Sequence, residues 1–230
     1  MARIHILGAS GTGTTTLGKA LADRLNCPHF DADRFYWLPT DPPFTMARPR
    51  EERLALLLGE IERTTSWVFS GSAVSWASPL EPLYELIVFL RLDQTLRMER
   101  LRRRESAQYG ARIEPGGDMA MASRQFLEWA AAYETAGLEQ FRTLATHEQW
   151  LTKQRCPVQR LDAAMQLTDL LEAVLANLSE IGRSVRSLPK PAEPEPNRDF
   201  EHAPPSAVRA ILDDLPIHIR PNLPAARVQT

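Results

Sequence analysis

The sequence has few of the features that mark secreted, membrane-spanning or nucleic-acid-binding proteins. It contains two cysteines, Cys27 and Cys156, without metal-like spacing, as is typical of a chain in a reducing compartment. No apolar run is long enough to span a bilayer. A formal net charge of −2 gives no broad basic surface for nucleic acid or anionic lipid. The first residues lead directly into an apolar run, which leaves no room for a signal peptide. We therefore expect a cytoplasmic protein with no nucleic-acid or membrane partner, and these features leave its oligomeric state open.

The 230 residues allow one domain with a full core and a C-terminal extension. Nine of the eighteen prolines lie between Pro189 and Pro224, among many charged residues. Such a composition buries too little apolar surface to order itself. We predict a folded domain over residues 1–182 and a proline-rich, disordered tail over residues 183–230. Within the tail, Ser206–Asp214 could form a short amphipathic helix on docking.

Strand-like and helix-like segments alternate along the folded part, which predicts a parallel sheet covered on both faces. The predicted strands are Arg3–Leu7, Pro28–Asp31, Trp67–Ser70, Leu86–Leu92 and Val158–Leu161. The predicted helices are Thr15–Leu25, Arg50–Thr64, Gln94–Ser106, Asp118–Ala136, Leu138–Lys153 and Gln166–Ile181. Asp93 fits the cap of the third helix, and Gly137 fits a break between the fourth and fifth.

A glycine-rich turn separates the first strand from the first helix. Gly8, Gly11 and Gly13 have the spacing of a phosphate-binding P-loop, G-x-x-x-x-G-K-[ST], with Thr15 at the position whose hydroxyl binds magnesium. Such a turn directs backbone N–H groups at an anion beside the positive end of the helix dipole. The dinucleotide pattern G-x-G-x-x-G fails, because Thr16 occupies the third glycine position. The residues predicted to bind the nucleotide are Gly8, Ser10, Gly11, Thr12, Gly13, Thr14, Thr15 and Thr16.

The lysine of this pattern is missing, because Thr14 occupies its position. That ammonium normally bridges the terminal phosphates during transfer. Lys19 cannot replace it, since five residues turn a helix by about 140° from Thr14. Either arginines elsewhere supply the charge, or the turn binds nucleotide without fast chemistry.

Two aspartates follow the second strand, where ligands bind in open α/β sheets. Asp31 and Asp33 should point the same way, so that one could hold magnesium and the other could accept a proton from, or orient, an acceptor hydroxyl. They could instead be solvated turn residues or a helix cap. At the end of the third strand, Ser70 stands where many P-loop proteins have an aspartate, and Gly71 would allow a substrate close to the backbone.

Positive charge is concentrated in the helix after the fourth strand, where Arg97, Arg100 and Arg104 share one face. The following loop, from Tyr109 to Gly117, has the composition of a mobile lid. A lid with arginines would supply the charge that Thr14 cannot, with Arg100 and Arg104 as catalytic candidates. The alternative is a solvated basic face.

Aromatic residues near arginines form a further candidate region. Tyr36, Trp37 and Phe44 precede Arg48, Arg50 and Arg53, which suits a planar or anionic acceptor, although they could equally cover the edge of the core. Phe126, Trp129 and Tyr133 read as packing residues, and His147 reads as structural.

These motifs resemble those of the P-loop small-molecule kinases, which include adenylate, shikimate and gluconate kinases. The chain is more similar to bacterial proteins described as adenylate kinase-related or as AAA-family ATPases, whose glycine loop is matched by Gly8–Leu17. The resemblance covers roughly Met1–Gly182. Further matching segments are Phe30–Asp33 with Tyr36-Trp37, Pro42–Phe44, Trp67–Ser72, Phe126–Ala130 and His147–Leu151.

The resemblance implies a three-layer P-loop NTPase sandwich with a five-stranded parallel sheet, an acceptor segment after the second strand and lid helices after the fourth. It implies ATP and Mg²⁺ as cofactors, with Thr15 and Asp31 at the metal and Asp31 and Asp33 serving metal and acceptor. The Asp-Gly-Phe-Pro-Arg signature of adenylate kinases is absent, which argues against AMP as the acceptor. We therefore expect a phosphotransferase that moves the ATP γ-phosphoryl group to a small-molecule acceptor, or else a nucleotide-binding switch with weak NTPase activity.

Overall fold

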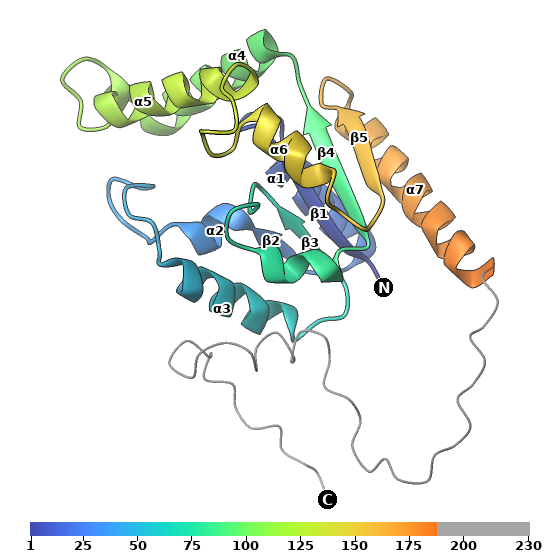
Figure 1. Cartoon of the computed structure of the whole chain (residues 1–230). Helices are drawn as coiled ribbons and strands as arrows, with labels where there is room; N and C mark the ends of the chain where they lie inside the picture. The colour runs from blue at the N-terminus through green and yellow to red at the C-terminus, as the bar shows by residue number, and fades with distance from the viewer. Residues whose placement is uncertain (188–230) are drawn as a thin grey trace, which may run out of the picture.

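The computed structural model describes residues 1–187 (Figure 1). Five strands form one parallel sheet in the order β2-β3-β1-β4-β5. They are β1 (Arg3–Gly8), β2 (His29–Asp31), β3 (Trp67–Ser70), β4 (Leu86–Arg91) and β5 (Val158–Asp162). The predicted tail lies outside the described residues, apart from the end of the last helix, and the predicted helix Ser206–Asp214 lies there entirely.

The central strands are mostly apolar because both of their faces are covered, with His5 as a buried polar residue in β1. All of β3, and all of β1 and β4 apart from one end residue each, are buried. In register, Ile6 of β1 lies beside Ser70 of β3 and Val88 of β4. This arrangement brings the carboxyl ends of β1, β2 and β3 to one edge.

Helices cover the two faces of the sheet and make a three-layer sandwich (Figure 1). On one face, α1 (Thr14–Leu25) and α7 (Leu167–Ser187) enclose a core that includes Ile4, Leu21 and Val174. On the other face lie α3 (Arg50–Ile61), the 3-10 helix η1 (Ser78–Leu83) and α6 (Leu144–Leu151). The predicted three-layer sandwich with a five-stranded parallel sheet is confirmed.

A helical hairpin extends beyond the carboxyl edge of the sheet (Figure 1). It consists of α4 (Gln94–Tyr109), η2 (Gly110–Ile113), α5 (Ala120–Ala131) and η3 (Ala132–Glu134). As predicted, Asp93 caps α4, because its Oδ1 accepts hydrogen bonds from the N–H groups of Thr95 and Leu96. None of the helices within residues 1–187 is long and apolar enough to cross a membrane.

The predicted helices differ from the observed ones in several details. No helix was predicted at α2 (Ala32–Tyr36). This short helix is capped by Asp31, so the alternative of a helix cap for this aspartate also holds. The helix predicted over Asp118–Ala136 is α5 followed by η3, and it ends before Gly137. The helix predicted over Leu138–Lys153 begins only at Leu144, because Thr143 caps it reciprocally with Thr146.

Candidate functional site

The glycine turn leads from β1 into α1 in the conformation that only glycine adopts readily. Gly11 has φ 90° and Gly13 has φ 89°, in the left-handed region. A Cβ on Gly8 would lie 2.7 Å from the carbonyl oxygen of Leu90 and 2.6 Å from Thr12 Oγ1. The turn is therefore compact on its inner side, and its glycines are required by its geometry.

The first turn of α1 offers its N–H groups to the open side of the site. Gly13 is the N-cap residue and provides no side-chain cap, and the first helical turn contains no acidic side chain. Thr14 and Thr15 are partly exposed. Uncapped N–H groups at a helix start, joined to a left-handed glycine turn, form the ordinary cradle for phosphate oxygens.

The two predicted aspartates lie at this cradle and have different partners. Thr15 Oγ1 donates a 2.8 Å hydrogen bond to Asp31 Oδ2, which joins the start of α1 to the end of β2. Asp31 Oδ1 accepts from the N–H of Asp33, 3.0 Å away. The proton of the Thr15 hydroxyl is directed to Asp31, and no group within residues 1–187 donates a hydrogen bond to its oxygen. A hydroxyl and a nearby carboxylate are hard oxygen groups that suit magnesium. Within residues 1–187 no group of three or more His, Cys, Asp or Glu side chains could hold a metal.

Asp33 is surrounded by groups that act on its charge. Asp33 is exposed as a residue, but the protein atoms near its carboxyl, and then the negative charge of Asp31, raise its pKa above the ordinary value of 3.8. Arg142 and Arg104 act in the opposite direction, so both guanidinium groups are near this carboxyl. A carboxylate with a raised pKa is a better proton acceptor than an ordinary aspartate.

Arg97 supports the turn from behind. Its side chain is completely buried and donates to the carbonyl oxygens of Ser10 (3.3 Å) and Ala130 (2.9 Å). It also pairs with both carboxylate oxygens of Glu134, the closer at 2.6 Å. A Cβ on Gly11 would lie 3.0 Å from the Arg97 carbonyl oxygen, so α4 packs tightly against the turn. The guanidinium charge of Arg97 is therefore fully paired within the protein.

The two arginines predicted to be catalytic lie in different surroundings. Arg100 donates from both terminal nitrogens to the carbonyl oxygen of Ala163, just after β5. The Arg104 side chain is 54% exposed, lies over the Phe126 ring at 5.7 Å and is 4.0 Å from Glu105. Of the two, Arg104 retains the more available charge.

The aromatic segment after β2 is paired with arginines from two distant parts of the chain. The ring of Tyr36 has the guanidinium of Arg53 at 3.7 Å and that of Arg142 at 4.7 Å. Trp37 and Phe44 lie edge to face beside it, with centroids 6.0 Å apart. The sequence analysis had linked Arg53 to these rings, whereas Arg142 was not identified from the sequence.

The loop after β3 completes this side of the site. Ser70 is buried and its hydroxyl pairs with His29 Nε2 at 2.9 Å, so it does not take the place of the aspartate that other P-loop proteins have here. Gly71 has φ 99°, and a Cβ there would lie 2.9 Å from the Cβ of Ala32 in α2. The hydroxyl of the next residue, Ser72, is 2.9 Å from His147 Nε2.

The sequence also matches known proteins, and these matches decide its family. Residues 4–119 match the AAA domain family. The chain belongs to this family. It is 42% identical over 176 residues to the uncharacterized protein YqaC of Bacillus subtilis (strain 168), across 76% of this chain and 97% of the relative. The match, together with the glycine turn at the edge of a parallel sheet, confirms the P-loop resemblance stated from the sequence.

Solved structures similar to this AAA-domain chain include two kinases. A gluconokinase from Sinorhizobium meliloti 1021 is 18% identical, with a TM-score of 0.48 over 80% of this chain and 95% of that one. A shikimate kinase from Bacteroides thetaiotaomicron is 21% identical, with a TM-score of 0.48 over 77% of this chain and 98% of that one.

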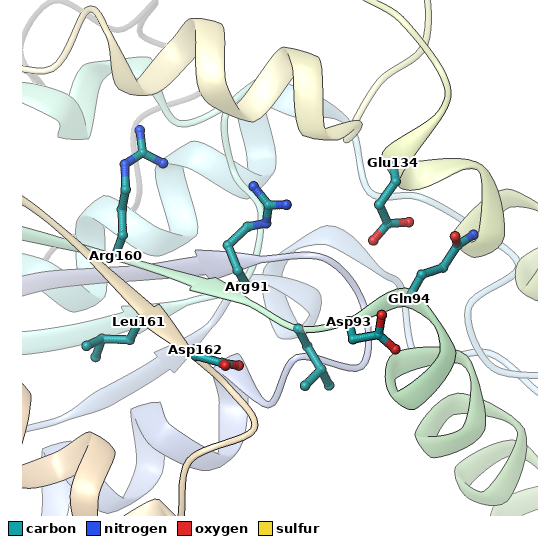
Figure 2. Close-up of a pocket in the computed structure, with 8 residues that line it drawn as sticks. Arg91, Asp93, Gln94, Glu134, Arg160, Leu161 and Asp162 are labelled. Atoms are coloured by element: carbon teal, nitrogen blue, oxygen red, sulfur yellow. The ribbon is translucent and has the colours of Figure 1, made fainter.

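A separate hollow of about 540 Å³ lies at the carboxyl ends of β4 and β5 of the AAA domain (Figure 2). Arg91 and Arg160 point to the same side of the two strands. Arg160 pairs with both carboxylate oxygens of Glu148, and Glu134 pairs with Arg97. Because most of these charges have partners in the protein, we assign no ligand to this hollow.

Proposed function

We propose that this AAA-domain protein is a magnesium-dependent kinase that transfers the ATP γ-phosphoryl group to a small, hydroxyl-bearing acceptor with an anionic group. The observation on which this proposal chiefly depends is the hydrogen bond from Thr15 to Asp31 at the end of the glycine turn. It joins the phosphate cradle to the strand end that also positions Asp33, so nucleotide and acceptor groups meet at one edge.

In this proposal the backbone of the turn binds the phosphates, with contributions from the residues predicted above, Gly8 to Thr16. Thr15 and Asp31 would hold Mg²⁺, Thr15 directly and Asp31 by orienting the hydroxyl or a bound water. The ion would neutralise charge between the terminal phosphates. The absence of three-carboxylate clusters within residues 1–187 suits a cation whose remaining ligands are phosphate and water.

Asp33 is the proposed proton acceptor for the attacking hydroxyl. Its raised pKa and its place beside Arg104 and Arg142 support this role. Arg104 is the proposed source of the positive charge that Thr14 lacks, because its side chain is 54% exposed and its ion pair with Glu105 is long, at 4.0 Å. Arg100 remains a candidate for the nucleotide side, next to the loop after β5.

The acceptor would lie against Tyr36, between Arg53 and Arg142. Neither guanidinium forms an ion pair with a carboxylate within residues 1–187, although Arg53 Nε donates to the Arg48 carbonyl oxygen and Arg142 acts on Asp33. Two guanidinium groups about one ring favour an anionic group such as a carboxylate or phosphate.

A nucleotide-dependent switch is the second candidate. Thr14 in place of lysine supports it, as does Arg112, which connects the lid to the segment after α2. Arg112 donates to Asp118 at 2.6 Å and to Asp41 at 2.9 Å. Such a bridge could report lid position without turnover.

The test combines calorimetric titration of ATP with Mg²⁺ and an ADP-release assay over a panel of hydroxy acids, sugar acids and nucleoside monophosphates. Gluconate and shikimate are useful probes because each has several hydroxyls and one carboxylate. The kinase proposal expects turnover stimulated by at least one acceptor. It also expects Asp33→Asn to lower kcat by at least about 100-fold while ATP affinity is kept.

Asp23→Asn is the matched control, because Asp23 is an exposed carboxylate near the far end of α1. It should leave turnover unchanged. Tight ATP binding with turnover at background for every acceptor would overturn the kinase and favour the switch.

A further inference from the structure

A buried line of hydrogen bonds runs from η3, at the end of the helical hairpin, to the loop after β3. His147 of α6 is buried, and its Nδ1 is 2.9 Å from the hydroxyl of Tyr133 in η3. Its Nε2 is 2.9 Å from the hydroxyl of Ser72. Tyr133 is also buried, whereas Ser72 is partly exposed. The line therefore has a protected end and an open end.

The protected end determines the direction of every proton in the line. A buried hydroxyl proton must find an acceptor. Within residues 1–187 the Tyr133 hydroxyl has His147 Nδ1 as its hydrogen-bond partner and no other. Tyr133 therefore donates to Nδ1, which must be unprotonated. A neutral imidazole then has its proton on Nε2, and Nε2–H donates to the oxygen of Ser72.

The imidazole stays neutral because its surroundings disfavour a charge. Burial, and then the positive charge of Arg142, lower the pKa of His147 from 6.5 to about 4. A group with so low a pKa is a poor proton acceptor for a substrate at neutral pH. His147 is consequently suited to orienting Ser72 and unsuited to removing a proton.

Because Ser72 accepts from His147, its own proton is free to point outward. We infer that the Ser72 hydroxyl donates a hydrogen bond to an oxygen atom of the acceptor substrate, and that His147 and Tyr133 are positioning residues that fix this direction. This inference rests on the proposed function for the identity of its ligand. Ser72 follows Gly71, whose backbone packs against Ala32 between Asp31 and Asp33. Arg142 lies over the Tyr36 ring and acts on both Asp33 and His147, so the Ser72 hydroxyl, which is bonded to His147, is on the acceptor side.

The proton arrangement is tested first, without any substrate. Long-range ¹H–¹⁵N spectra of the full chain with labelled histidine, at pH 7, should show His147 protonated on Nε2 and unprotonated on Nδ1. The His147→Gln variant identifies its signals among those of the other histidines. Tyr133→Phe should remove this preference, because Nδ1 then loses its donor. A His147 protonated on Nδ1, or charged at pH 7, would overturn the inference.

Ligand contact is tested by titrating gluconate, shikimate and the other panel acids into the full chain with ADP and Mg²⁺. Ser72→Ala should weaken binding of the acid that binds roughly 3- to 10-fold, as expected for one lost hydrogen bond. Ser72→Thr should restore most of the affinity, Tyr133→Phe should weaken it less, and ADP affinity should stay constant in all. The control is Ser179→Ala, a serine on the exposed side of α7.

The outcomes separate the two proposals. An acid that binds in a Ser72-dependent manner but is never phosphorylated overturns the kinase and supports the role of Ser72. Phosphorylation of an acid whose binding and turnover are indifferent to Ser72→Ala overturns the inference alone. If no panel member binds, both proposals fail.

Discussion

Acid should destabilise this domain through its buried histidines, and His5 allows the effect to be isolated. His5 lies in β1 with no exposed surface, stacked between Phe69 and Tyr84. Burial chiefly, with a smaller effect of His147, lowers its pKa from 6.5 to about 3, although a hydrogen bond to the Phe69 carbonyl oxygen acts in the opposite direction. The folded state therefore keeps His5 neutral at any pH above about 4.

The direction and size of this change in stability follow from proton linkage. Between pH 6.5 and the folded pKa, the unfolded chain binds a proton that the folded chain does not, so stability falls as pH falls. A pH of 5 is about 1.5 units below the pKa of histidine in the unfolded chain. Protonation of the unfolded chain therefore lowers the free energy of unfolding by about 2 kcal/mol relative to pH 8. His147, with a pKa of about 4, adds a similar amount. The two together give about 4 kcal/mol.

The assay is urea unfolding followed by circular dichroism at pH 8 and pH 5, for the native chain and for His5→Phe. Phenylalanine keeps the ring stack but cannot be protonated. The variant should lose about 2 kcal/mol less than the native chain between the two pH values, whatever its stability at pH 8. Equal losses in both proteins would refute the assignment of a neutral, buried His5.

Three further changes test the glycine turn and its support. Thr14→Lys should keep or strengthen ATP affinity, measured by calorimetry, since Thr14 is partly exposed at the open end of the turn; a clear loss of affinity would contradict the cradle. Arg97→Met should lower the free energy of unfolding by about 3 kcal/mol, because it leaves Glu134 without its closest partner. An unchanged free energy in urea unfolding would show that the buried pair is dispensable. Gly8→Ala should lower the free energy of unfolding by about 1–3 kcal/mol, measured by thermal unfolding, because the new Cβ would lie 2.7 Å from a backbone oxygen. An unchanged stability would mean that the turn relaxes easily.

The sheet could be read from the sequence because its central strands are short, mostly apolar runs that end at turn or polar residues. Strands of this kind, alternating with amphipathic helices, have few arrangements open to them. Helix ends were harder to predict. The apolar residues Leu138 and Phe141 continue a helical spacing, yet both are exposed and Arg142 adopts φ 62°, so the helix begins only after them.

The positions of the candidate site residues were predictable where those residues are close in sequence. The glycine turn, Asp31 and Asp33 follow from strand ends and spacing alone. The roles of the arginines could not be predicted in this way, because a shared helical face does not show which groups each side chain contacts. Arg97 is directed into the protein at Ser10, while Arg142 reaches Tyr36 from more than a hundred residues away.

The sequence analysis interpreted His147 as structural, but its link to Ser72 joins residues 75 positions apart. Nothing in the local pattern around either residue signals such a pair. From the sequence alone, one could predict at most that His147 is a polar residue in a helix that follows the helical hairpin.

The most direct measurement of the central claim is a titration of the ¹⁵N-labelled full chain with a nonhydrolysable ATP analogue and Mg²⁺, followed through its backbone amide signals. The account predicts that the amides of Gly11, Gly13, Thr14 and Thr15 shift together and reach saturation at one stoichiometric equivalent. If these four signals stay in place while the analogue is shown to bind elsewhere or not at all, the phosphate cradle does not exist and the proposed chemistry has no site.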